Sequence, residues 1–324
     1  MLLTSLLALI LIQEPAPGQV GPGEGAQAHE KFNAGETIIE HISNNHEHPL
    51  IELPRVFGID FSVTKHVFML WFVAALLFLI VTLTVRRYLR QDRLIPSGFM
   101  NALEAVVEFI RDDVTQPNVG RKWVMTWTPL ILTFFFFILS ANAIGLIPLF
   151  DTLAVLDRLV LHTSTDSFLR RLIQGGTTAT ANFNVTAALA TITFICIIIA
   201  GAKAHGFVKH WKNLLPHGLN PVVKFSILLP IEVIGMFVRP FALTMRLAAN
   251  MTGGHIAILS ILSFVFLFTE IFGRASAGIG VGMIVSVPLA VGISALEIIV
   301  VLVQAYVFTL LSAVFIGMAI NVHH

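Results

Sequence analysis

Charged residues are scarce in this chain. Asp, Glu, Lys and Arg make up 12% of its 324 residues, whereas ordinary soluble domains carry about 25%. Hydrophobic residues make up 56%, and the mean hydropathy is +0.84. The net charge of +1 and the lack of any run of Lys and Arg give no sign of nucleic-acid binding. The composition therefore predicts a membrane protein with several spans, embedded in a lipid bilayer.

The chain has a single cysteine and lacks two common catalytic motifs. The single Cys196 lies in the apolar run TFICIIIAG, where we expect it to act as a small hydrophobic side chain. The sequence contains neither the H-E-x-x-H motif of metalloproteases nor the G-x-S-x-G motif of hydrolases. We find no internal repeat of the kind that secondary transporters show. No metal, cofactor or catalytic residue is predicted.

The N-terminal region predicts export. Residues 1–12 are apolar but too short to span, since a transmembrane helix needs about 20 residues. A Pro/Gly-rich stretch with Ala26-Gln27-Ala28 follows, so we interpret residues 1–28 as a cleavable signal peptide, with an uncleaved anchor as the alternative. We expect residues 29–60 to form an external segment and residues 61–324 to form the membrane domain. The external segment holds histidines whose spacing fits no zinc site and which we expect to be solvated: His29, His41, His46 and His48.

The apolar runs predict an all-α protein with about five crossings. Single spans are expected at Val67–Val85, Thr128–Phe150 and Val185–Gly201, with a polar external loop from Asp151 to about Asn182. Residues 97–112 have apolar side chains at helical spacing, which predicts one amphipathic helix on the membrane surface. Two basic segments fall on the same side, which the positive-inside rule assigns to the cytoplasm. We therefore expect the N-terminus outside and the C-terminus in the cytoplasm.

The last third contains two unusually long apolar runs, Pro221–Phe268 and Ala275–Ile320. Each would be about 70 Å long as a helix, whereas the hydrocarbon layer is about 30 Å thick. We predict two long helices that tilt steeply or bend, because Pro230, Pro240 and Pro288 can each interrupt the hydrogen-bond ladder. The alternative is that each run is a pair of ordinary spans joined by a tight turn.

Polar residues inside these runs are the candidate functional residues. Arg246 is the most costly, since a mid-bilayer arginine costs roughly 3 to more than 10 kcal/mol and cannot lose its proton. Glu232, Arg239 and Arg246 are spaced seven residues apart, so they lie on one face of the first long helix. Glu297 and Gln304 have the same spacing on the second long helix. The other members of the set are Glu232, Arg239, Asn250, His255, Glu297 and Gln304, with Gly253 and Gly254 where a second helix could approach closely. The alternative for any one of them, Arg239 above all, is that it only holds helices together.

Four stretches carry a resemblance to subunit a of F-type ATP synthases, which covers residue 55 to the end. PFALTMRLAANMTGGH resembles the family signature, an arginine followed by L-x-x-N-x-x-x-G. IEVIGMFVRP resembles the preceding glutamate-bearing helix, LEIIVVLVQAYVF the final helix, and NVTAALA the start of an earlier span. His255 and Glu297 stand in the reverse order of many bacterial members, which is similar to mitochondrial-type members.

The resemblance implies a bacterial inner-membrane stator subunit that is not catalytic alone. It would stand beside a ring of c subunits, with peripheral-stalk b subunits and the remainder of the synthase as further partners. Arg246 would separate two offset half-channels, with Asn250, His255, Glu297 and Gln304 on the external one and Glu232 at the cytoplasmic exit. The competing interpretations are a secondary transporter, a membrane enzyme, or a passive structural subunit of a respiratory complex. Copurification with a ring of small hairpin proteins would separate them.

Overall fold

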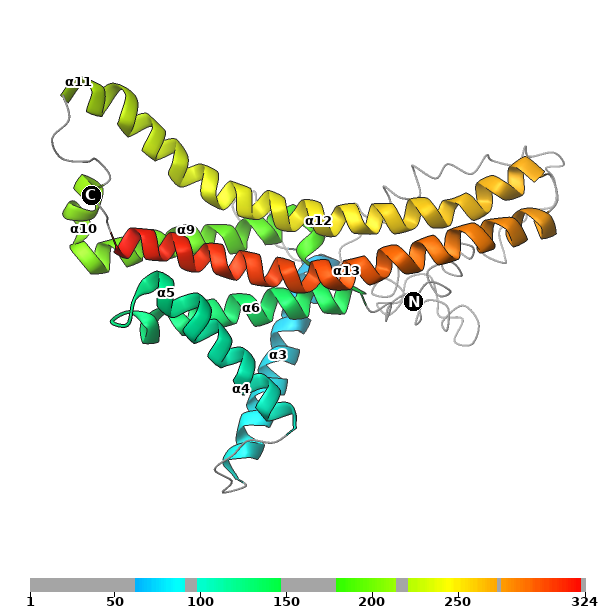
Figure 1. Ribbon diagram of the computed structural model, residues 1–324, viewed down its shortest axis with the longest axis horizontal. Coiled ribbons are helices and arrows are strands. Elements are labelled where there is room, and N and C mark those ends of the chain that lie inside the picture. Colours follow the sequence, from blue (N-terminus) through cyan, green and yellow to red (C-terminus); the bar gives the residue numbers. More distant parts are fainter. Residues whose placement is uncertain (1–61, 91–97, 147–178, 214–220, 273–274, 322–324) are drawn as a thin grey trace. The chain divides into compact units, whose positions relative to one another are not determined.

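The computed structural model describes residues 62–90, 98–146, 179–213, 221–272 and 275–321. The regular elements of these residues are helices (Figure 1). In chain order they are α3 (Lys65–Leu89), α4 (Phe99–Phe109), η1 (Ile110–Thr115), α5 (Gln116–Val119), α6 (Val124–Leu146), η3 (Ala179–Ala181), α9 (Phe183–His205), α10 (Phe207–Asn213), α11 (Pro221–Val223), η4 (Lys224–Leu228), α12 (Leu229–Phe272) and α13 (Ala275–Ile320).

Five of the described helices are long and apolar enough to cross a membrane. They contain the segments His66–Leu89, Val124–Leu146, Phe183–His205, Ser226–Val265 and Gly282–Ile320. This confirms the expected all-α, polytopic fold. Helix α6 begins at Val124 and not at Thr128, because Val124 and Trp127 are also buried in the core.

The two long helices of the last third are also confirmed. Helix α12 has 44 residues and continues through Pro240, and helix α13 has 46 residues and continues through Pro288. The alternative of two ordinary spans joined by a tight turn in each run is therefore wrong. The expected signal peptide, the histidines of the N-terminal segment and residues 151–178 of the polar loop lie outside the described residues.

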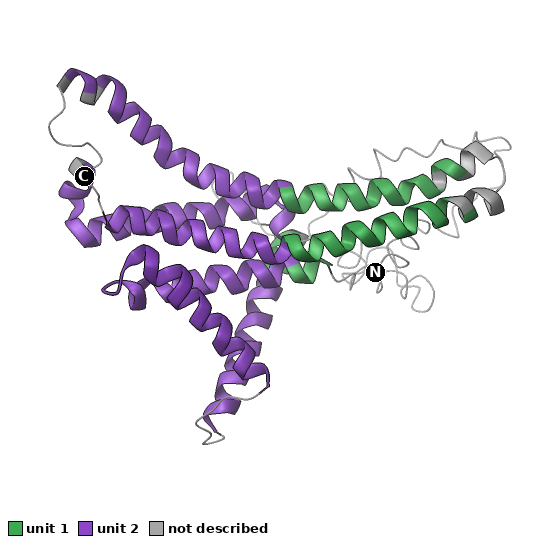
Figure 2. Cartoon of the chain, viewed as in Figure 1, with its two compact units in different colours: residues 1–70, 143–179, 250–300 green, residues 71–142, 180–249, 301–324 purple. Residues whose placement is uncertain are grey.

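The helices divide into two compact units (Figure 2). Unit 1 comprises Met1–Leu70, Ala143–Ala179 and Asn250–Val300, and unit 2 comprises Trp71–Asn142, Thr180–Ala249 and Val301–His324. Each long helix contributes to both units. Helix α12 changes unit after Ala249, and helix α13 changes unit after Val300.

Unit 2 has a large apolar core. Helices α6 and α9 and the C-terminal part of α13 supply most of it, together with η1, α5 and the unit 2 part of α12. Ile131, Ile138 and Ile316 are fully buried there. The rings of Phe134 and Phe308 meet edge to face with their centroids 5.6 Å apart, a favourable geometry for aromatic pairs. This core fixes the first part of α12 and the last part of α13.

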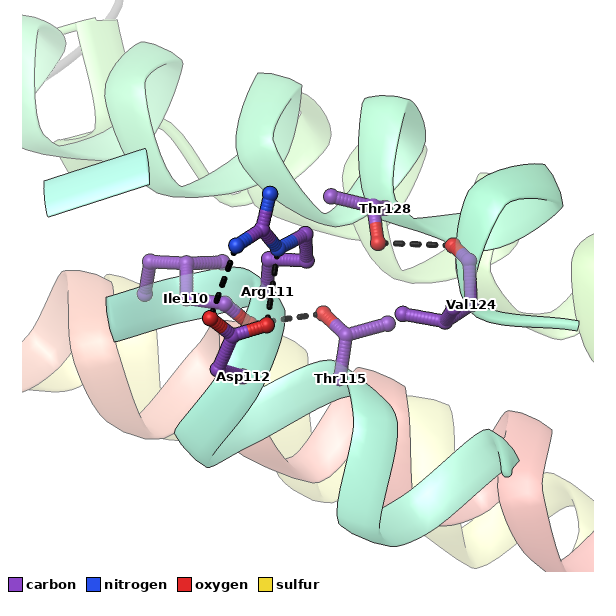
Figure 3. Close-up of polar contacts among 6 residues, drawn as sticks. All are labelled: Ile110, Arg111, Asp112, Thr115, Val124 and Thr128. Atoms are coloured by element: carbon purple, nitrogen blue, oxygen red, sulfur yellow. Dashed lines mark hydrogen bonds and ion pairs between the residues drawn. The ribbon is translucent and has the colours of Figure 1, made fainter. Parts of the chain in front are cut away.

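The surface helix α4 does not end where the sequence predicted but continues through the π-helix η1 into α5. Pro117 has no N–H with which to bond the carbonyl four residues earlier, which favours a wider turn before it. The Thr115 hydroxyl donates to the Ile110 carbonyl at 2.8 Å, five residues back (Figure 3). Gly120, with φ 81°, then ends α5 in a backbone conformation that favours glycine.

The exposed side of this turn carries an ion pair. The Arg111 guanidinium donates to the Asp112 carboxylate at 2.7 Å (Figure 3). That hydrogen bond lowers the pKa of the Asp112 carboxyl below its ordinary value. Since the pair is exposed, it contributes little to stability.

Unit 1 contains a pair of antiparallel helices formed by its parts of α12 and α13, which run side by side (Figure 2). Its apolar cluster is small. The buried members are Ile258, Ile261, Leu262, Val265 and Ala290. At Gly282 the two helices approach so closely that an added Cβ would lie 2.6 Å from the Val265 Cα atom.

Candidate functional site

Glu232 and Arg239 form an ion pair in unit 2. Glu232 lies in the first turn of α12, and Arg239 follows two turns later. Their Oε1 and Nη2 atoms are 3.8 Å apart. The Arg239 guanidinium also lies 5.7 Å from the centre of the Phe315 ring of α13. Arg239 is therefore held by two neighbours, which supports the interpretation that it is the partner of Glu232.

Arg246 has neither an ion-pair partner nor an aromatic ring beside it among the described residues. Arg246 is exposed, whereas the nearby Leu243 and Leu247 are buried in the core. The exposed residues around it on α12 are mostly apolar, and they are Ala242, Met245, Ala249 and Asn250. Among the described residues, no hydrogen bond or ion pair reaches the Arg246 side chain. The chain thus presents a permanent cation on an apolar surface of a membrane-spanning segment.

His255 and Glu297 meet in unit 1. The His255 Nδ1 atom of α12 lies 3.6 Å from the Glu297 Oε1 atom of α13. The Glu297 side chain is 9% exposed, and its second oxygen, Oε2, has no hydrogen-bond partner among the described residues. The sequence predicted that these two residues contact each other, and the distance is consistent with that prediction. Because an imidazole and a carboxylate can each accept and release a proton, the pair has the chemistry to pass one.

Gly254 provides the space for the Glu297 carboxylate. A Cβ atom at Gly254 would overlap the Glu297 Oε1 atom, whereas a Cβ at Gly253 would meet nothing within 4 Å among the described residues. The two adjacent glycines therefore differ in role. The close approach expected for both is made at Gly254, by a side chain of the neighbouring helix.

The two amide residues of the predicted set lie in different units. Asn250 is exposed on the unit 1 part of α12. Gln304 is buried in the unit 2 part of α13, next to the fully buried Ala305. Both were expected to line the external half-channel, and that assignment stays a prediction.

Sequence reasoning passed over a buried polar pair in unit 2. The Thr180 hydroxyl of η3 donates to the Asn142 Oδ1 atom of α6, and both residues are fully buried. The Asn142 Nδ2 atom has no partner among the described residues. An asparagine in the apolar run of a membrane-spanning segment is the signal that could have found it. Among the described residues, no group of three or more His, Cys, Asp or Glu could hold a metal ion.

Comparison with known proteins settles the family. A family model described as ATP synthase A chain matches residues 67–317. The chain belongs to this family. It is 39% identical over 303 residues to ATP synthase subunit a of Pelodictyon phaeoclathratiforme, covering 91% of this chain and 78% of that protein. It is also 41% identical over 300 residues to ATP synthase subunit a 2 of Chlorobium luteolum, covering 90% and 77%.

A more distant relative is similar over the same extent. ATP synthase subunit a of Anaeromyxobacter dehalogenans is 33% identical over 332 residues, covering 95% of this chain and 76% of that protein. The family membership and the membrane-spanning helices confirm the resemblance seen in the sequence. They identify the chain as a multi-pass membrane protein of the ATP synthase A chain family.

Proposed function

We propose that this chain is the stationary proton-translocating subunit in the membrane sector of an F-type ATP synthase, beside a rotating ring of c subunits. The chain is not catalytic alone and works with the rest of the synthase. Peripheral-stalk b subunits are the further partners that we assign. The N-terminus is placed outside and the C-terminus in the cytoplasm of a bacterial inner membrane, in keeping with the basic segments that follow α3 and α9.

The observation that carries the proposal is the exposed Arg246 on an apolar helix surface. An arginine facing lipid would cost roughly 3 to more than 10 kcal/mol, and it keeps its charge at every physiological pH. No described residue of this chain pairs with Arg246, and we assign its counter-charge to another chain. A ring of subunits that each carry one membrane-embedded carboxylate supplies such a counter-charge repeatedly.

The fixed charge explains how proton flow would be coupled to rotation. Arg246 attracts a ring carboxylate only in its deprotonated form, so each carboxylate must release its proton before it passes. The same charge repels a proton that would otherwise cross directly between two offset half-channels. Moving one charge across the membrane releases about 2.3 kcal/mol per 100 mV, which is the energy available to turn the ring.

The remaining polar residues divide between the two half-channels. His255 and Glu297, in contact in unit 1, form the external relay, with Asn250 and Gln304 as further lining residues. Glu232 marks the cytoplasmic exit, about 21 Å from Arg246 along α12 at 1.5 Å per residue. Arg239 holds Glu232, and Gly254 gives the Glu297 carboxylate its place.

Lysine substitutions at the two arginines of α12 test the proposal. We expect Arg246→Lys, like Arg246→Ala, to abolish coupled ATP synthesis in an assembled complex, since a desolvated lysine can lose its proton. Arg239→Lys is the matched control. It keeps a cation beside Glu232 and should leave coupling largely intact. The measurement is ATP synthesis driven by a proton gradient in membrane vesicles, with assembly checked by copurification of the c ring. Near-normal coupled synthesis with Arg246→Ala would refute the proposal.

A further inference from the structure

Ser286 of α13 is fully buried and Ser294 of α13 is partly buried, and both differ from four other helical hydroxyls. Thr128, Thr244, Ser263 and Thr309 each donate to the carbonyl four residues earlier in their own helix, at 2.6 to 3.0 Å. This is the usual way in which a serine or threonine satisfies itself inside an apolar helix. The buried Oγ atoms of Ser286 and Ser294 have no hydrogen-bond partner among the described residues.

Both serines lie on the row of α13 that faces α12. Gly282 contacts the α12 backbone at Val265, and Ala290 belongs to the apolar cluster shared with α12. Ser286 stands between these two at a spacing of four residues, so it lies on the same row. Ser294 follows four residues after Ala290. Glu297, three residues further, contacts His255 of α12.

This row therefore carries three polar atoms for which the described part of the chain offers no partner, the two serine hydroxyl oxygens and the Glu297 Oε2 atom. Ser286 is fully buried and Glu297 nearly so, which means that neither lipid nor a neighbouring chain can reach them. Buried polar atoms without a protein partner are normally satisfied by ordered water. Along the helix, Ser294 lies about 4.5 Å from Glu297 and Ser286 about 12 Å from Ser294. One water can bridge the first gap, and a short chain of waters the second.

We infer that Ser286 and Ser294 line a water-filled path along the contact of α12 and α13, by which protons reach or leave Glu297. The inference rests on the proposed function, because the water-filled path would bring protons to the His255–Glu297 relay. Each hydroxyl can both accept and donate a hydrogen bond, so it can stand in a proton-conducting chain. The two serines are positioning residues, since they hold water and do not themselves gain or lose the proton.

Cysteine accessibility tests the path in the intact synthase. Ser286→Cys and Ser294→Cys are made separately in a Cys196→Ala background and exposed to Ag⁺, which travels through water but not through apolar packing. Ser263→Cys is the matched control, because Ser263 is buried in the same helix pair but bonds to the Leu259 carbonyl. We expect Ag⁺ to inhibit ATP-driven proton pumping several-fold in the two test variants and not in the control.

Comparing right-side-out and inverted vesicles assigns the side. We expect the thiols to react with Ag⁺ from the outside of the cell, and reaction from the cytoplasmic side alone would overturn the inference. A second measurement does not depend on the thiols. Ser286→Thr keeps the hydroxyl and should retain most proton flux, whereas Ser286→Val removes it and should lower the flux several-fold. Equal flux in these two variants would also overturn the inference.

Failure of the path and failure of the proposed function give different results. If both cysteines are as unreactive as the Ser263→Cys control while Arg246→Ala still abolishes coupling, the path alone is wrong. If Arg246→Ala synthesises ATP normally, the proposed function is wrong and the inference falls with it.

Discussion

The two units treat buried polar atoms differently. In unit 2 a large apolar core surrounds hydroxyls that bond within their own helices, such as Thr128 and Thr309. In unit 2 the buried polar atoms without a partner among the described residues belong to Trp127 and Asn142 of α6 and to His210 of α10. In unit 1 the core is small, and the polar atoms of α13 that have no partner among the described residues lie on one row that ends at Glu297.

This difference indicates a division of labour. Unit 2 is built as a scaffold, whose core holds α12 so that Arg246 projects outward and Glu232 stays paired. Unit 1 has a small apolar core, and the contact between its two helices holds the Glu297 carboxylate, the His255 imidazole and serine hydroxyls. Burying such groups is unfavourable unless water or another partner satisfies them, so their clustering points to use and not to stability. Substitutions in unit 1 should therefore change proton flow more than assembly.

The largest effect is expected from the adjacent glycines of unit 1. Gly254→Ala would place a methyl group on the Glu297 Oε1 atom and force the carboxylate away from its position. In a positioned reaction, a displacement of about 1 Å can cost about 100-fold in rate. Gly253→Ala meets nothing among the described residues and raises helix propensity by the same amount, roughly 0.5–1 kcal/mol. We expect strong loss of ATP-driven proton pumping in Gly254→Ala and near-normal pumping in Gly253→Ala.

The amount of assembled complex decides what a loss of pumping in Gly254→Ala means. The amount of assembled complex should be unchanged in both variants, because the substitution lies outside the core of unit 2. Equal pumping by the two variants would show that the position of Glu297 does not control proton flow, and the contrast between the units would lose its main support.

The next largest effect concerns the pair itself. His255→Glu would put two carboxylates together, and Glu297→His would put two imidazoles together, so each single change leaves an unsuitable pair. The double exchange restores one group of each kind. It should recover more proton flux than either single variant, which the coupling term of a double-mutant cycle measures. Strictly additive losses, with the double variant worse than both singles, would show that the residues act separately.

The sequence predicted these features to different extents, for physical reasons. The long helices follow from uninterrupted apolar runs. Arg246 stands out because the free-energy cost of an arginine in a membrane is large whatever the details of the packing around it. The π-helix η1 depends on how Pro117 is accommodated, which tertiary packing decides. The serines of α13 could not be singled out, because a helical serine usually bonds to its own backbone. The different roles of Gly253 and Gly254 depend on which one faces Glu297, and that requires the register of two helices.

A moderate effect is expected at the ion pair of unit 2. Glu232 and Arg239 are partly exposed, so the pair contributes at most about 1 kcal/mol to stability. Glu232→Gln should leave assembly intact and slow proton flow only a few-fold, as expected for an exit group outside the coupling step. In a Cys196→Ala background, Glu232→Cys should react with a water-soluble thiol reagent added from the cytoplasmic side. Protection from that side with labelling from the other would reverse the assigned orientation.

The smallest effect is expected at α10, which tests whether a buried polar atom in unit 2 is only structural. His210 packs on Gly201 of α9, where an added Cβ would overlap its ring, and its Nε2 atom has no partner among the described residues. Burial, and to a lesser extent the nearby His205, lowers the pKa of His210 below its ordinary value of 6.5. With α10 undocked, His210 therefore binds a proton more readily than in the packed state, so docking weakens as the pH falls through about 6.5. We expect the protection factors of the α10 amides, which divide out the intrinsic pH dependence of exchange, to fall modestly on acidification in the wild type and to stay unchanged in His210→Gln. If the wild-type protection factors are equal at both pH values, protonation of His210 is not linked to the docking of α10.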